Sequence, residues 1–147
     1  MTPSTSSLLV QAQEALHCAE KALSAVARAT TDRPFLTMIL PPDQGALDLV
    51  TKNAAAVITG HRDLTEQFLE SRGDQLEDEY LLNELSDIEL DIGNLLRKCY
   101  LQHDRLRASR HAMLALGIEG LIEATGKWLA QWSQMRQLVR ARRHSAS

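Results

Sequence analysis

A long apolar repeat in the second half of the chain restricts the fold more than any other feature of the sequence. The repeat occupies positions 81, 85, 88, 92, 95, 99, 102, 106, 109, 113 and 116, in alternating steps of four and three. Nine of these eleven residues are apolar or cysteine, and none is glycine or proline. A mean spacing of about 3.5 residues keeps one stripe on one side of a helix. The repeat therefore predicts a long helix packed lengthwise against other helices.

The composition of the chain favours an all-α fold. Its 147 residues include only four prolines and seven glycines, too few for the frequent turns of a β-protein. Aromatic residues make up 4% of the chain, while alanine and leucine are abundant, as in helices that approach one another closely. The length and the 44% of apolar residues suit one domain that buries its own core. We expect a single helical-bundle domain over residues 1–147, with disordered ends at 1–6 and 142–147.

Two helices and an irregular connection are predicted in the first half. The first helix spans about residues 6–30, because the proline at 34 disfavours a helical residue before it. The second runs from Asp43, a suitable N-cap, to about residue 72, and glycine follows at 73. Between them, Phe35–Leu40 is apolar, uncharged and bracketed by prolines, which makes it too short for a bundle helix. We expect a crossover pressed onto the core, or alternatively a docking segment for a partner.

The second half contains the two remaining predicted helices. The third opens at residue 74 or 75 and carries the long apolar repeat to at least Ser109. Gly117 and Gly120 mark the expected break, and the fourth helix covers about residues 121–140. The predicted fold is an elongated antiparallel four-helix bundle with a proline-bracketed crossover after its first helix.

Charge is distributed unevenly along the third and fourth predicted helices. Residues 74–91 contain eight acidic side chains and no basic one, whereas residues 97–110 contain five bases and one acid. This order complements the dipole of a single helix, and it also suits two patches that pair with a charged partner or between subunits. The candidate interaction residues are Glu77, Glu84, Asp87, Asp91, Arg97, Arg105, Arg110, Trp128, Trp132, Arg136 and Arg140.

His61 is the most unusual single residue. It lies on the apolar stripe of the second predicted helix, together with Val50, Val57 and Leu64. A lone histidine in such a position is typically neutral and hydrogen-bonded to a backbone carbonyl or a side chain. We therefore predict a buried polar His61. A phosphotransfer histidine is the alternative, but it has to be exposed and followed by glycine, whereas glycine precedes His61 here.

No catalytic or cofactor-binding motif is apparent in the sequence. It has no glycine-rich phosphate loop, no HExxH and no cysteine pair with metal-ligand spacing. The pair Glu14 and His17 forms the one Glu-x-x-His, whereas a di-metal bundle needs two. We expect no enzyme activity, cofactor or metal. The two distant cysteines and the lack of a long apolar segment predict a cytoplasmic protein that does not enter a membrane.

These features favour a non-enzymatic protein–protein interaction module, such as an adaptor, regulator, inhibitor or secretion-chaperone-like bundle. We expect a homodimer, with the third and fourth helices and the Trp128/Trp132 face at the contact. The alternative is a nucleic-acid-associated regulator that uses the arginines of the same helices, and a metal-binding bundle is a weaker alternative. Arginine outnumbers lysine twelve to four, which is typical of GC-rich bacterial genomes.

Overall fold

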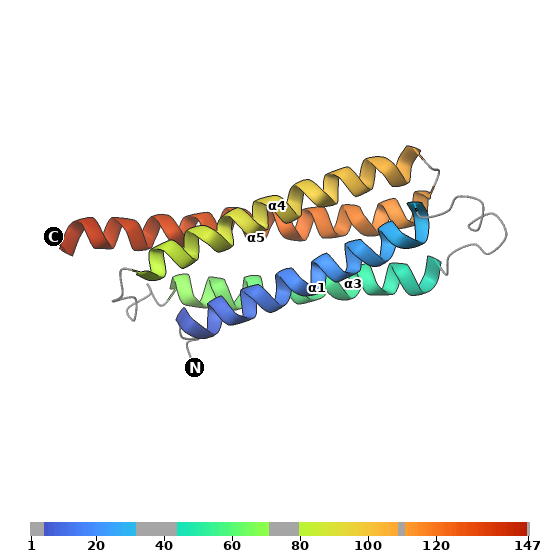
Figure 1. Cartoon of the computed structure of the whole chain (residues 1–147). Coiled ribbons are helices and arrows are strands. Elements are labelled where there is room, and N and C mark those ends of the chain that lie inside the picture. The colour runs from blue at the N-terminus through green and yellow to red at the C-terminus, as the bar shows by residue number, and fades with distance from the viewer. Residues whose placement is uncertain (1–4, 32–43, 71–79, 109–110, 147) are drawn as a thin grey trace.

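Four long helices lie side by side in the computed structural model, which describes residues 5–31, 44–70, 80–108 and 111–146 (Figure 1). The helices are α1 (Thr5–Thr31), α3 (Gln44–Glu70), α4 (Tyr80–Ala108) and α5 (Ala112–Ala146). Each helix runs opposite to the one before it along the chain (Figure 1). No strand occurs in the described part of the chain. The predicted all-α, antiparallel four-helix bundle is confirmed.

The helices are not neighbours in simple chain order. α1 packs against α3 and α4, and α5 packs against the same two helices. Among the described residues, α1 does not contact α5 and α3 does not contact α4, so these pairs lie across the diagonals. Because directions alternate along the chain, α1/α3 and α4/α5 are antiparallel, while α1/α4 and α3/α5 are parallel. The bundle therefore consists of two antiparallel hairpins placed side by side.

The apolar repeat forms the buried side of α4 over most of its predicted length. The buried positions of the repeat are Leu85, Ile88, Ile92, Leu95, Cys99, Gln102 and Leu106. They face a core to which α1 contributes mainly alanine and leucine, so the helices approach closely through small side chains. Leu81 and Ser109 fall outside the side chains that the structure describes. Met113 and Leu116 contradict the prediction, because they are 64% and 65% exposed.

The end of α4 explains why the repeat fails at Met113 and Leu116. The backbone N–H of His111 donates to the carbonyl of Leu106 at 2.9 Å, which closes the last turn of α4. The carbonyl of His111 then accepts from the N–H of Ala115 at 3.0 Å, which starts α5. The chain turns between the two helices, so a spacing counted across this turn no longer describes one face.

The predicted break at Gly117 and Gly120 is wrong, because both glycines lie inside α5. A Cβ atom added at Gly117 would lie 3.0 Å from Oδ1 of Asp48 and 3.5 Å from Cγ2 of Thr51, both on α3. Gly120 has open space at the same position, with nothing within 4 Å. The glycine at 117 therefore serves the close approach of α5 to α3 rather than a turn.

The ends of the helices differ from the predicted ends in two places. α5 continues to Ala146, so most of the 142–147 segment that we expected to be disordered is helical. Figure 1 shows this end of α5 projecting beyond the other helices. Thr5 and Ser6 likewise belong to α1. The Phe35–Leu40 crossover lies outside the described residues, as does the predicted start of the third helix.

None of the helices in the described ranges combines the length and the apolar content that crossing a bilayer requires.

Candidate functional site

A buried histidine joins α3 to α1. The side chain of His61 is 4% exposed, and its Nε2 donates to the carbonyl oxygen of Leu8 on α1 at 3.0 Å. The hydroxyl of Thr65, one turn further along α3, donates to the carbonyl of His61 at 2.9 Å and lies 3.4 Å from its Nδ1. These partners suit a neutral imidazole that carries its proton on Nε2. His61 thus occupies the inward position that the sequence predicts for it.

Both tryptophans of the chain pack against this histidine. The imidazole centroid lies 5.2 Å from the Trp128 ring, in an edge-on arrangement, and 5.7 Å from the Trp132 ring. The two tryptophan side chains meet edge to face at 6.3 Å, a favoured geometry for aromatic pairs. Both are fully buried. The prediction that they form an accessible docking face is therefore wrong, because the chain's own helices cover them.

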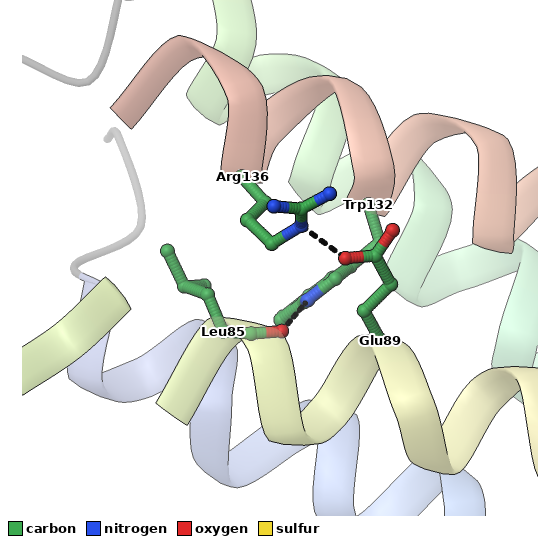
Figure 2. A network of polar contacts seen from close by, with 4 residues as sticks. All are labelled: Leu85, Glu89, Trp132 and Arg136. Atoms are coloured by element: carbon green, nitrogen blue, oxygen red, sulfur yellow. Dashed lines mark hydrogen bonds and ion pairs between the residues drawn. The ribbon is translucent and has the colours of Figure 1, made fainter. Parts of the chain in front are cut away.

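Trp132 extends the same group of contacts to α4 (Figure 2). Its Nε1 donates to the carbonyl of Leu85 at 2.9 Å, and one turn further along α5 Arg136 pairs with Glu89 of α4. Through Leu8, His61, Trp132 and Leu85, polar and aromatic contacts connect all four helices. This polar core holds the helices in register, and the buried ring of His61 has no access to a substrate from solvent.

Burial of His61 makes the stability of the bundle depend on pH. Burial lowers the pKa of His61 below its ordinary value of 6.5, and the hydrogen bond to Leu8 opposes that shift only in part. The unfolded chain therefore takes up a proton at this residue at a higher pH than the folded chain does. By linkage, the neutral ring contributes fully to the free energy of unfolding above pH 6.5, the pKa of the unfolded chain. This contribution is lost as the pH falls from 6.5 toward the lower pKa of the folded chain.

We expect urea unfolding to show this loss directly. The wild-type free energy of unfolding should fall between pH 7.5 and pH 5 more steeply than that of His61→Gln, which has no imidazole at this site. The difference between the two slopes removes the contribution of carboxylates that titrate in both proteins. Parallel slopes would contradict the burial of His61.

The outer surface of the α1/α3 hairpin is hollowed and partly apolar. An open groove of about 970 Å³ lies along this surface, lined by Cys18 and Ala25 of α1 and by Val50 and Asn53 of α3, among others. Val50 is 40% exposed, and Val57, two turns further along the same side of α3, is 43% exposed. We call this surface the α1/α3 groove. It exposes apolar side chains where a well-covered bundle would bury them.

Basic side chains lie along the α1/α3 groove. Lys21 and Arg28 line it, and neither forms an ion pair with another described residue. Glu20 also lines the groove, but its carboxylate pairs with Lys98 of α4 at 3.6 Å. The uncompensated charge along this edge is therefore positive, and it favours an acidic partner.

The sequence prediction placed Val50 and Val57 in the core, and the structure corrects this. The buried side of α3 is centred instead on Thr51, Ala54 and Ile58. Positions 50 and 57 lie next to positions 51 and 58, so the apolar stripe of α3 is wider than its neighbours cover. The sequence signal that could have located the groove is the width of this apolar stripe, which is greater than one buried side of a helix requires.

The acidic candidate residues are exposed along α4. Glu84, Asp87 and Asp91 are all accessible, as expected for residues flanking the apolar repeat, and Glu77 lies outside the described residues. Leu90, Tyr100 and Leu101 are the large exposed apolar residues described on this helix, at 59%, 53% and 53%. Leu90 lies about 16 Å along the axis from Leu101, so the three do not form a continuous patch.

The basic candidates do not gather on one face. Arg97, Arg105 and Arg107 are exposed on α4, but at about 100° per residue Arg105 and Arg107 lie about 80° to either side of Arg97. Arg136 is half-buried in its pair with Glu89, and Arg140 is exposed on α5. Arg110 lies outside the described residues.

Within the described ranges, no group of three or more histidine, cysteine, aspartate or glutamate side chains is placed to hold a metal ion. Glu14 and His17, the Glu-x-x-His pair, are both exposed. Cys18 and Cys99 are free thiols, and burial raises the pKa of Cys99 to about 12, so its thiol stays protonated at neutral pH.

Comparisons with known proteins do not assign the chain to a family, since no family model, curated protein or solved structure matches it.

Proposed function

We propose that the protein is a non-enzymatic interaction module that binds a helix of another protein in the α1/α3 groove. The observation that carries this proposal is the exposure of Val50, which lines the hollow together with Cys18 and Ala25, and of Val57 two turns further along the same side of α3. Small side chains on the groove floor let a third helix approach closely, and the two valines offer it apolar contacts. The free thiols fit a reducing cytoplasm as the place of this activity.

The basic edge of the groove indicates the chemistry of the partner. A helix that fits here carries an apolar stripe flanked by carboxylates, because Lys21 and Arg28 have no acidic partner among the described residues. The charges steer association and orient the helix, while the apolar contacts supply most of the affinity. The arginines that the structure describes on α4 spread over different faces, which gives less support to a nucleic-acid regulator.

Photocrosslinking followed by binding measurements tests the proposal. A photoreactive residue at Val57 should yield one defined adduct in the cells that produce the protein, and the same residue at Leu116 should not. Leu116 is a matched control, because it is exposed and lies on α5, which does not contact α1 within the described residues.

With the crosslinked partner purified, we expect Val57→Glu to weaken binding at least tenfold, because it places a charge in an apolar contact and repels an acidic helix. Leu116→Glu should bind like the wild type. Equal affinities for the two variants, or equal crosslinking from both positions, would refute the α1/α3 groove as the docking surface.

A further inference from the structure

We infer that a second copy of this chain occupies the α1/α3 groove before a partner binds, packed antiparallel about a twofold axis. The inference rests on the proposed function only in using the same surface. It relocates the predicted homodimer contact from the third and fourth helices to the first hairpin, α1/α3.

The charges on α1 are self-complementary in one arrangement. Glu14, Lys21 and Arg28 are exposed and spaced seven residues apart, so they lie on one side of α1, and the last two line the groove. When two α1 helices pack antiparallel with the twofold axis at Lys21, Glu14 of each copy faces Arg28 of the other. A parallel arrangement would place like charges opposite one another. The symmetry of a closed dimer thus produces two identical ion pairs.

The two lysines at the axis do not prevent this pairing. Lys21 is exposed, so its long side chain can turn its ammonium group toward solvent while its methylene groups cover apolar surface.

The exposed valines of α3 suit the same twofold arrangement. Val50 lines the same hollow as Lys21, so it lies near the proposed axis and faces its own copy. His61 contacts Leu8, which shows that the chain direction takes Val57 toward the amino end of α1. The same axis that places α1 against the second α1 places α3 against the second α3, so Val57 extends the exposed apolar side of α3 along this contact.

The size of the surface is sufficient for a stable dimer. Each helix of the α1/α3 hairpin has 27 residues and is therefore about 40 Å long, and two adjacent helices are about 20 Å wide. A face of this size is about 800 Å² per copy, which is the usual extent of a specific protein–protein interface.

Reciprocal charge exchange is the decisive test. In sedimentation velocity at low salt, the wild type should be a dimer, while Glu14→Arg and Arg28→Glu should each raise the dimer dissociation constant at least tenfold. The double variant should recover most of the affinity, because it restores the ion pairs with opposite polarity. Glu84→Arg changes an exposed charge on α4 and should leave the dimer intact. A wild-type monomer at high micromolar concentration, or single variants that dimerise normally, would overturn the inference.

Crosslinking at the axis gives an independent readout. In a Cys18→Ser background, Lys21→Cys should form a disulfide-linked dimer under mild oxidation, because a residue on a twofold axis faces itself. Lys127→Cys, on the exposed side of α5, should not. A photocrosslink from Val50 to residues 32–43 of the same chain, in a monomer, would identify a different occupant and also overturn the inference. If no dimer forms while Val57→Glu still weakens partner binding, only the second-copy inference fails.

Discussion

Ile92→Asp should abolish the folded state, whereas Leu90→Asp, two positions earlier on the same helix, should leave it nearly unchanged. Ile92 is fully buried in the core and Leu90 is 59% exposed. An aspartate at position 92 loses the packing of the isoleucine and places a carboxylate in the apolar core. The expected cost exceeds about 4 kcal/mol, a large part of the roughly 5–15 kcal/mol that stabilises a typical domain. Far-ultraviolet circular dichroism and thermal melts measure both variants.

A third variant, Glu89→Ala, tests a residue at the boundary between the buried and exposed sides of α4. Glu89, the residue directly before Leu90, is partly buried and pairs with Arg136 of α5 (Figure 2). Sequence spacing alone predicts that Glu89→Ala changes little, but the half-buried ion pair implies a modest loss of about 1 kcal/mol. We expect Leu90→Asp to be the most stable of the three variants, Glu89→Ala to be intermediate and Ile92→Asp to be the least stable. A wild-type melting midpoint for Ile92→Asp would show that α4 does not present this side to the core.

The long repeat could be assigned from the sequence because nothing interrupts it between Leu85 and Leu106. Over such a length, periodicity outweighs local propensity, and every position of the repeat from Leu85 to Leu106 is buried. The same spacing led to a wrong prediction beyond Leu106, because Met113 and Leu116 keep the spacing of the repeat although they lie on α5, after the chain has turned. The turn itself contains neither glycine nor proline at the positions that usually mark one.

The candidate site was harder to predict, because one sequence shows which side of a helix is apolar but not what covers it. Trp128 and Trp132 looked like a docking face, yet α5 buries both of them against His61. Val50 and Val57 looked like core, yet the neighbours of α3 leave them partly exposed. Both errors arise from the order of helices around the bundle, which places α1 diagonal to α5. That order depends on long-range packing rather than on any local pattern.

Trp132→Ala should be among the most destabilising truncations in the protein, with a loss of about 3–5 kcal/mol in the free energy of unfolding. Its ring is fully buried, contacts His61 and Trp128, and donates a hydrogen bond to the carbonyl of Leu85. The alanine variant removes a large volume from the point where contacts from all four helices meet. Urea unfolding at neutral pH, where His61 is uncharged, measures the loss.

The two phenylalanine variants isolate the hydrogen bond within that loss. Trp132→Phe and Trp128→Phe remove the same atoms from fully buried side chains, but Nε1 of Trp128 has no hydrogen-bond partner among the described residues. Trp132→Phe should therefore cost about 1 kcal/mol more than Trp128→Phe, the net value of one buried hydrogen bond. The packing losses nearly cancel in this comparison, so the difference reports on the link between α5 and Leu85 of α4. Equal losses would mean that this hydrogen bond adds nothing to the free energy of unfolding.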